Sequence, residues 1–452
     1  MSVIDAVLLV STVALAIALV AAPRIGRRVA PFALPVLIIG SLLLWVLEGY
    51  RHWWPLYLLI VAMFAFVVTD AAGTRRRVWF RAGIGVVAVV SILPWAVPPS
   101  PELPEPTGPY AVGSEIFRWV DEQRPEPATA ADDRRNVVVQ AWYPTEIESG
   151  RQWVYLDGRD QLPSRVSGIP GFLLSDVSID TNATADVPVS PARDRWPVVL
   201  FSPGYGAPRA FYSGLIADLA SRGFIVLAVD HPYESAVTEL ADGTIATTVE
   251  NISADDPDAI RFMTERVETR TADLRFVLDQ LARPEILGPI ENRVDPAHLT
   301  VIGHSLGGAA ALAALSADQR FTAAANLDGT LYGDLPERAL NRPVLLLESD
   351  HAETGHSQRY LDGNRGLLER LQANGFRYEF SEADHYSFTD VPQFLAAPVR
   401  FVVTRMIGGS RGAANTQRAT NDILTPFLLG RHGEVDAAAT GHSGVTGGPV
   451  RR

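Results

Sequence analysis

Residues 299–312 constrain this chain more than any other stretch, because a glycine–x–serine–x–glycine motif lies there between a strand pattern and a helix pattern. The apolar run 299–302 leads into GHSLG at residues 303–307, and an alanine-rich helical segment follows. In this context the serine is held at a sharp turn with its hydroxyl exposed, and the glycines leave room for the turn. The motif therefore predicts that Ser305 is a nucleophile.

Short runs rich in valine, isoleucine and leucine alternate with helical patterns from residue 196 to residue 429. This alternation is typical of a mostly parallel sheet with helices on both faces, and together with the serine motif it predicts an α/β-hydrolase fold. We expect strands near 136–144, 198–202, 225–229, 299–302, 323–327, 344–347 and 377–380, and helices near 209–221, 258–281, 357–374 and 421–429.

Four apolar runs fill the first hundred residues, and each is close to the length that crosses a bilayer. They lie at about 6–22, 29–47, 53–69 and 82–97. Arginines concentrate in the first and third connections, which predicts that these loops face the cytoplasm. The sequence thus predicts about four transmembrane helices in the cell membrane, with everything after residue 97 outside the cytoplasm.

Changes in composition suggest four parts of the chain. Residues 1–98 form the membrane anchor, 99–135 form a proline-rich linker and entry segment, and 136–430 form a hydrolase domain. Within that domain, 146–195 reads as a loop-rich insertion, whose apolar patch Gly168–Leu174 is either a lid or a buried loop. The tail 431–452 is rich in glycine, alanine and serine, and we expect it to be disordered.

Charge and cysteine content exclude several classes of function. The first 98 residues contain eight arginines and three acidic residues, a net charge of +5. The whole chain has a net charge of −12, so the residues after position 98 carry −17. Such an acidic domain argues against nucleic acid as a partner. The chain has no cysteine, so neither a disulfide framework nor a thiolate metal site is available.

A serine nucleophile needs a histidine base and an acid that orients it, and these follow the serine along the chain in α/β-hydrolases. His385 fits the base, because it lies just past the strand pattern at 377–380. Two aspartates compete for the acid: Asp328 ends the first strand after the serine motif, and Asp350 follows the next one. The general preference for the later strand favours Asp350.

The second oxyanion donor of this fold comes from a loop that follows an early strand. Here a strand ends in GYG at residues 204–206, before a helical pattern. We therefore assign the oxyanion hole to the backbone N–H groups of Tyr205 and Leu306. Nothing in this scheme needs a metal or an organic cofactor. His351, Glu353 and His356 lack a further matched ligand, so a metal site is not favoured.

Three stretches together resemble the platelet-activating factor acetylhydrolase family of α/β-hydrolases. They are residues 201–230, GHSLGG at 303–308, and NLDG at 326–329, and the likeness covers roughly 110–429. The resemblance implies that the acid is Asp328, and that His385 belongs to the family's histidine segment. It also implies hydrolysis of phospholipids with short sn-2 acyl chains. Pro203, where the animal enzymes have histidine, and the membrane anchor are departures from the family pattern.

The combined interpretation is a membrane-anchored serine esterase or lipase that acts on a lipid or small ester. Ser305, Asp328 and His385 form its triad. One alternative is a general carboxylesterase or polyester hydrolase. The other is a non-catalytic α/β-hydrolase-fold membrane protein, which would have no physical need for all three triad residues.

Overall fold

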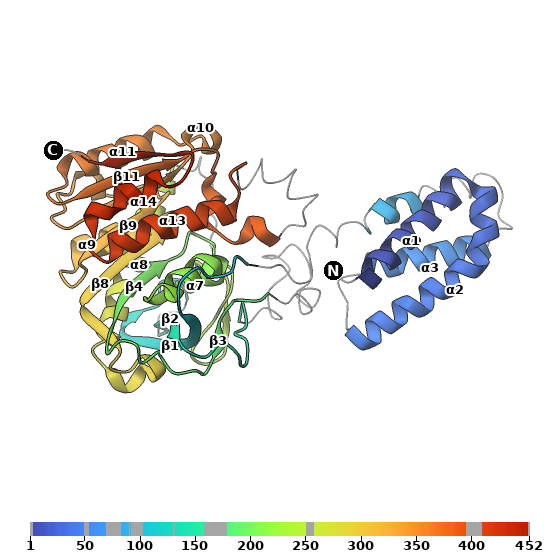
Figure 1. Ribbon diagram of the computed structural model, residues 1–452, viewed down its shortest axis with the longest axis horizontal. Coiled ribbons are helices and arrows are strands. Elements are labelled where there is room, and N and C mark those ends of the chain that lie inside the picture. The colour runs from blue at the N-terminus through green and yellow to red at the C-terminus, as the bar shows by residue number, and fades with distance from the viewer. Residues whose placement is uncertain are drawn as a thin grey trace. The chain divides into compact units, whose positions relative to one another are not determined.

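The computed structural model describes residues 3–48, 54–68, 83–89, 91, 103–129, 132–157, 179–249, 257–394 and 409–450. These residues form two compact units, one built from the N-terminal helices and the other from a large sheet with its helices (Figure 1). The apolar patch Gly168–Leu174 lies outside the described residues, so its predicted role as lid or buried loop stays a prediction.

The N-terminal unit contains helices α1 (Val3–Ala21), α2 (Pro23–Glu48) and α3 (Trp54–Val68), and a short helical segment at 83–89. Leucines and one methionine, among them Leu19, Leu59 and Met63, pack between the helices. Apolar side chains also cover the outer surface. Phe32 and Val36 are 79% and 69% exposed, so these helices lack the polar face of a soluble bundle.

Among the described helices, one contains a stretch that is long and apolar enough to cross a membrane, Pro23–Leu42 in α2. The corresponding stretches of α1 and α3, Val7–Ala21 and Leu56–Val67, are shorter, and only part of the fourth predicted run is described. The expectation of about four spanning helices is therefore supported for a single helix.

The second unit is built on a ten-stranded mixed sheet in the order β12-β11-β10-β9-β8-β4-β5-β2-β1-β3. The strands from β11 to β5 in this order run parallel, whereas β12 and β2 join the two ends antiparallel. The strands are β1 (Ala111–Pro125), β2 (Arg134–Thr145), β3 (Thr184–Ala185), β4 (Trp196–Ser202), β5 (Ile225–Asp230), β8 (Val294–His304), β9 (Ala323–Leu327), β10 (Val344–Ser349), β11 (Gly375–Phe380) and β12 (Val445–Pro449). A separate hairpin pairs β6 (Thr238–Glu239) with β7 (Ile245–Ala246).

Helices cover both faces of the sheet, which confirms the coarse prediction of an α/β-hydrolase architecture. Helices α8 (Ala259–Gln280), α9 (Leu306–Ala317) and α11 (Gln358–Arg370) contribute to the core on one face. On the other face α7 (Ser213–Ser221), α13 (Ala413–Leu428) and α14 (Val435–Thr440) lie together (Figure 1). The central strands are buried along their whole length and are apolar except at their carboxyl ends, as a sheet covered on both faces requires.

The predicted disorder of the tail 431–452 is contradicted by its described part. Val435 and Ala439 of α14 are buried, and β12 pairs antiparallel with the edge strand β11. The glycines that suggested disorder have a packing role: a Cβ at Gly447, where φ is +136°, would lie 2.1 Å from the carbonyl oxygen of Arg377. Glycine thus permits a close backbone approach here.

The strand β1 extends the sheet within residues 99–135, which the sequence suggested to be a linker and entry segment. It pairs with β2 from Ala111↔Thr145 to Pro125↔Arg134. Partly buried positions interrupt its apolar pattern, as expected near the edge of a sheet. The sheet of the hydrolase unit therefore includes residues ahead of position 136.

Candidate active site

Ser305 occupies the sharp turn between β8 and α9 that the sequence predicted. Its φ of 55° and ψ of −124° lie in a region that non-glycine residues rarely adopt. The turn depends on close backbone contacts, because a Cβ at Gly307 would lie 2.0 Å from the Ser202 carbonyl oxygen, and one at Gly303 2.3 Å from the Gly307 carbonyl carbon. Strain of this kind at one serine is typical of a functional residue.

Ser305 and His385 line one cavity of about 380 Å³ at the carboxyl end of the parallel strands. The predicted oxyanion residue Tyr205 lines it too, as do the aromatic side chains of Phe211 and Tyr386. The structure thus brings the candidate nucleophile, the candidate base and one candidate oxyanion segment to a single concave site. Such a site is where ligands bind in α/β folds.

His385 and Asp328 form a hydrogen-bonded pair. His385 lies in a 3-10 turn, η8 (His385–Phe388), after β11, and Asp328 follows β9 with φ of 55°. The Nδ1 atom of His385 lies 2.7 Å from Oδ2 of Asp328. Because a carboxylate only accepts, Nδ1 carries the proton, which leaves the Nε2 atom of His385 as the free basic nitrogen.

Asp328 is buried, yet its carboxyl stays ionised. Burial alone would raise its pKa, but hydrogen bonds from His356 and His385 outweigh that effect and hold the pKa well below its usual range. The backbone N–H and the hydroxyl of Ser349 and the hydroxyl of Tyr360 donate further bonds. A permanent negative charge therefore faces the Nδ1 side of His385.

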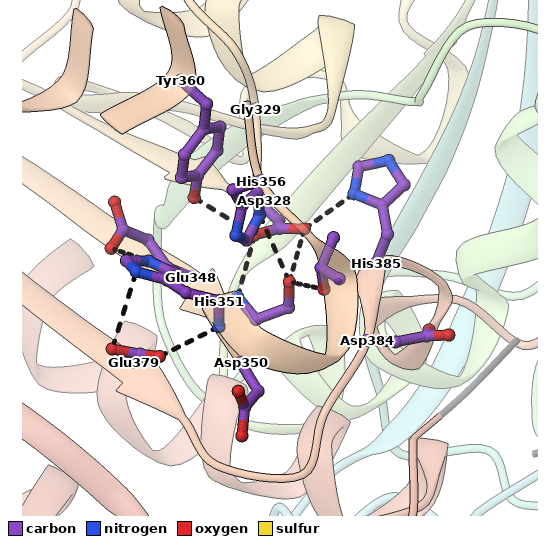
Figure 2. A network of polar contacts seen from close by, with 12 residues as sticks. Asp328, Gly329, Glu348, Asp350, His351, His356, Tyr360, Glu379, Asp384 and His385 are labelled. Carbon is purple, nitrogen blue, oxygen red and sulfur yellow. Dashed lines mark hydrogen bonds and ion pairs between the residues drawn. The ribbon is translucent and has the colours of Figure 1, made fainter. Parts of the chain in front are cut away.

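Asp350, the competing acid, lies elsewhere and has other partners. Its carboxylate caps the short helix α10 (His351–Thr354) by accepting bonds from the backbone N–H groups of Ala352 and Glu353. It also accepts one from Glu382, at 2.8 Å, on the loop that leads to His385. Figure 2 shows Asp350 away from the contacts between Asp328 and the histidines. The geometry supports Asp328, as the family resemblance implied, and makes Asp350 a helix cap.

The two segments that carry the predicted oxyanion donors flank Ser305. Leu306 is the first residue of α9, where backbone N–H groups have no partner within the helix. On the other side a Cβ at Gly204 would lie 3.4 Å from Cβ of Ser305, so the 204–206 loop passes directly beside the nucleophile. Two N–H donors near one serine can hold a developing oxyanion.

A chain of hydrogen bonds, which sequence reasoning missed, links this loop to the base. The N–H of Gly204 donates to the Tyr212 hydroxyl (2.9 Å), which lies 2.8 Å from Nδ1 of His304. The Nε2 atom of His304 lies 2.9 Å from the His385 carbonyl oxygen, so Nε2–H donates and Nδ1 accepts. Burial, with the nearby His385, lowers the pKa of His304 to about 3, so this ring stays neutral.

Below the loop lies a second serine–histidine–aspartate arrangement that the sequence also did not reveal. The Ser202 hydroxyl lies 2.9 Å from Nε2 of His231, and Nδ1 of His231 lies 2.8 Å from Oδ2 of Asp273. All three side chains are buried. Arg270 donates to the carbonyl oxygen of the next residue, Pro203. The arrangement supports the loop from inside and does not line the cavity.

Within the described residues, no group of three histidine, aspartate or glutamate side chains is placed to hold a metal ion. His351 and His356 lie near each other, with ring centroids 4.9 Å apart. His351 is hydrogen-bonded to Glu348, and His356 to Asp328. The geometry of this cluster is that of a hydrogen-bond network (Figure 2).

Comparisons with known proteins place similar sequences among acetylhydrolases and esterases. Residues 96–363 match the family model described as platelet-activating factor acetylhydrolase, isoform II. A probable 1-alkyl-2-acetylglycerophosphocholine esterase of Arthroderma benhamiae is 26% identical over 336 residues, which cover 70% of this chain and 83% of that protein. The platelet-activating factor acetylhydrolase of the dog, Canis lupus familiaris, is 29% identical over 63% of this chain and 66% of its own length.

A solved structure also resembles the chain. The ferulic acid esterase of Streptomyces cinnamoneus superposes with a TM-score of 0.63 at 30% sequence identity, and the match covers 77% of this chain and 99% of the esterase. The family model and the two relatives confirm the resemblance to the acetylhydrolase family, and the solved structure supports an esterase fold.

Proposed function

The chain belongs to the platelet-activating factor acetylhydrolase, isoform II, family and is a serine ester hydrolase, and we propose that Ser305 is its nucleophile. One observation carries the assignment: His385, whose Nδ1 lies 2.7 Å from buried Asp328, lines the same cavity as Ser305. In this arrangement one nitrogen of the base is fixed by the acid and the other is free for the serine.

The reaction follows from these positions. Nε2 of His385 takes the hydroxyl proton as Oγ of Ser305 attacks the acyl carbonyl, and Asp328 stabilises the imidazolium that forms. The N–H groups of Tyr205 and Leu306 hold the oxyanion. The C–O bond to the alkoxide then breaks as His385 gives it the proton, and an acyl-enzyme remains. A water molecule, deprotonated by the same nitrogen, releases the acid and restores Ser305.

We propose short acyl esters of zwitterionic or neutral lipids as the substrate class. The cavity of about 380 Å³ lies at the small end of ligand sites, which favours a short acyl group. The family description and two relatives carry acetylhydrolase or acetyl-glycerophosphocholine esterase names. The acidic charge after residue 98 disfavours anionic head groups by repulsion.

A second candidate is an aromatic acyl ester, such as a hydroxycinnamate. Four aromatic side chains, Tyr205, Phe211, Tyr212 and Tyr386, line the cavity, and aromatic rings stack favourably on one another. The solved structure that resembles this chain is a ferulic acid esterase. Both candidates use the same nucleophile and differ only in the acyl group.

We further propose that the N-terminal helices anchor the enzyme in the cell membrane as a multi-pass bundle, with the hydrolase domain outside the cytoplasm. The apolar outer surface of α1 to α3 supports embedding in lipid. The hydroxyls of Thr12 and Ser41 bond to the carbonyl oxygens of Leu8 and Leu37, four residues earlier, so these helices leave neither hydroxyl unsatisfied. The arginine-rich connections support the orientation.

A substrate panel on the detergent-solubilised full chain separates the candidates. We expect kcat/KM to be highest for a 2-acetyl glycerophosphocholine and to fall as the sn-2 chain lengthens. Each methylene group that no longer fits the acyl pocket should lower kcat/KM by about tenfold or more. Methyl ferulate is the competing substrate, and Ser305→Ala provides the background. Faster hydrolysis of methyl ferulate than of any acetyl ester would favour the aromatic candidate.

The orientation has its own test. Protease added to intact spheroplasts of a bacterial host should release the hydrolase domain by cutting between residues 98 and 109. Cleavage that occurs only after lysis would indicate that the hydrolase domain lies in the cytoplasm.

A further inference from the structure

A second histidine, His356, contacts the same carboxylate as the candidate base. Its Nε2 atom lies 3.0 Å from Oδ1 of Asp328, whereas His385 bonds to Oδ2. The two histidines thus bond to different oxygens of the same carboxylate (Figure 2). The usual triad needs only one of these contacts, so the other requires an explanation.

The chain fixes His356 in place. It lies in the turn between α10 and α11, after Gly355 in the left-handed conformation and before Ser357, whose hydroxyl caps α11. Its ring stacks on Tyr360 of α11, with centroids 3.9 Å apart and planes 14° apart. The side chain is only 6% exposed. A buried, stacked ring on a capped turn has little freedom to move away from Asp328.

The donors divide unequally between the two oxygens of Asp328. Oδ1 accepts from His356, from the Tyr360 hydroxyl at 3.1 Å and from the Ser349 N–H at 2.8 Å. Oδ2 accepts from His385 and from the Ser349 hydroxyl. Three donors on Oδ1 prevent rotation of the carboxylate about its Cβ–Cγ bond. This restraint keeps Oδ2 directed at His385.

The charge of His356 follows from its two nitrogens. Nε2 donates to the carboxylate, and Nδ1 is buried and has no hydrogen-bond partner among the described residues. A protonated Nδ1 would be a buried donor without an acceptor, which is costly, so the ring is a neutral donor. The titratable groups around it are Asp328, Tyr360 and His351, and behind them lie His385 and Glu348.

We propose that His356 is a positioning residue, a neutral hydrogen-bond donor that locks Asp328 in the orientation that stabilises the His385 imidazolium. The proposal rests on the proposed function, since it assigns a role toward the triad pair. It differs from a purely structural role in one respect: losing the donor must weaken the support that Asp328 gives to protonated His385.

Three variants test this role. His356→Phe keeps a flat ring on Tyr360 and removes the donor, His356→Gln keeps an N–H donor, and Tyr360→Phe removes only the hydroxyl. His442→Phe is the matched control, because His442 forms a 2.9 Å bond to an aspartate, Asp422, away from the cavity. The readouts are kcat, KM, the pH profile of kcat/KM and the melting temperature, with p-nitrophenyl acetate as substrate.

For His356→Phe we expect kcat to fall by about tenfold to a hundredfold, the usual effect of losing one hydrogen bond to a charged group. KM should change by less than about twofold, since His356 does not line the cavity. The acid limb of the kcat/KM profile should move to lower pH by about one unit, because a tenfold loss of imidazolium stabilisation has that effect. His356→Gln should recover most of the loss, Tyr360→Phe should reproduce it in part, and His442→Phe should behave as wild type.

Several results would overturn the proposal. One is an unchanged kcat in both His356→Phe and Tyr360→Phe. Another is a loss of kcat in His356→Phe with an unshifted or upward-shifted acid limb and no recovery in His356→Gln, which would indicate a structural role. If His356→Phe fails to fold, Tyr360→Phe and His356→Gln decide. Activity retained by Ser305→Ala would instead refute the proposed function, and so the two failures are distinguishable.

Discussion

The hydrolase unit contains two serine–histidine–aspartate arrangements, and we propose that only one of them is catalytic. In the buried one, Ser202, His231 and Asp273 are joined by hydrogen bonds of 2.9 and 2.8 Å. In the other, Asp328 and His385 are joined at 2.7 Å, and His385 lines the same cavity as Ser305. The buried set has the more complete hydrogen bonds. Bond geometry alone therefore does not identify a nucleophile.

The two carboxylates differ in their charged partners. Asp273 accepts from Arg135, at 3.1 and 2.7 Å, and from Arg124, at 2.8 Å. Burial would raise the pKa of Asp273, but the Arg135 charge holds it far below its usual range. Burial, and then the charge of Arg270, lower the pKa of His231 and keep it neutral. Asp328 has no arginine partner among the described residues, so its charge remains for His385.

The serines differ in backbone and in access. Ser202 ends the buried strand β4, whereas Ser305 lies at the strained turn with φ of 55° and lines the cavity. The side chain of His385 is 31% exposed and that of His231 is fully buried. We therefore infer that a catalytic triad needs a carboxylate that is not paired with an arginine and an accessible nucleophile, as well as the correct hydrogen bonds.

Replacing the two serines should give the largest contrast. Ser305→Ala should lower kcat on the order of 10⁴-fold or more, because the nucleophile is lost and only residual catalysis remains. Ser202→Ala should stay within about tenfold of wild type, since its hydroxyl bonds only to a neutral ring inside the core. Steady-state hydrolysis of p-nitrophenyl acetate measures both. Similar losses in both variants would erase the distinction.

The next contrast is between the two candidate acids. Asp328→Asn should lower kcat on the order of 10³-fold to 10⁴-fold, because the amide no longer fixes the correct tautomer of His385. Asp350→Asn should be mild, since asparagine is also a good helix cap. The same assay tests both variants, and the reverse ranking would restore Asp350 as the acid.

For stability, we expect the buried arrangement to matter more than the proposed catalytic one. Asp273→Asn leaves the buried guanidinium of Arg135 with one carboxylate fewer, and we expect it to cost about 3–5 kcal/mol of unfolding free energy. Asp328→Asn leaves no arginine of the described residues without a carboxylate partner, so it should cost less unfolding free energy. Urea unfolding of both variants gives the comparison. A larger loss of unfolding free energy in Asp328→Asn would mean that Asp328, and not Asp273, is the main structural carboxylate.

A third buried carboxylate, Asp390, sharpens the electrostatic argument. Neutral donors surround it, namely the Gly214 N–H, the Gln417 amide and the Tyr155 hydroxyl. Burial raises its pKa to about 7 despite these bonds. Its contribution to stability is therefore fully present below about pH 4, the unfolded value, and is lost as the pH rises through about 7.

Substitution of Asp390 by asparagine should remove this pH dependence. Between about pH 5 and 8, the melting temperature of wild type should fall relative to that of Asp390→Asn as the carboxyl ionises. Parallel curves for the two proteins over this range would show that Asp390 does not titrate there.

The sequence predicted the parts of the site that depend on local pattern. The glycines around Ser305 are needed for the sharp turn, and the position of His385 after the serine matches the chain order of α/β-hydrolases. Both signals are visible without a structure. The choice of Asp328 required a family resemblance, because both aspartates end strands and only the fold determines which one meets His385.

Other features depend on long-range packing and left no local signal. The bonds of Ser202 to His231 and of His231 to Asp273 join positions 29 and 42 residues apart. His356 is separated by 28 residues from Asp328. The tail was misjudged because its glycines suit both disorder and a close strand contact, and only the neighbouring backbone of Arg377 decides between them.

The most direct test of the account is to map the serine that reacts with a fluorophosphonate probe in the full-length protein. We predict that the probe labels Ser305 in wild type and in Ser202→Ala, and that Ser305→Ala is not labelled. Peptide mass mapping identifies the modified residue. Labelling at Ser202, or labelling retained by Ser305→Ala, would contradict the central claim that the open arrangement, and not the buried one, carries the nucleophile.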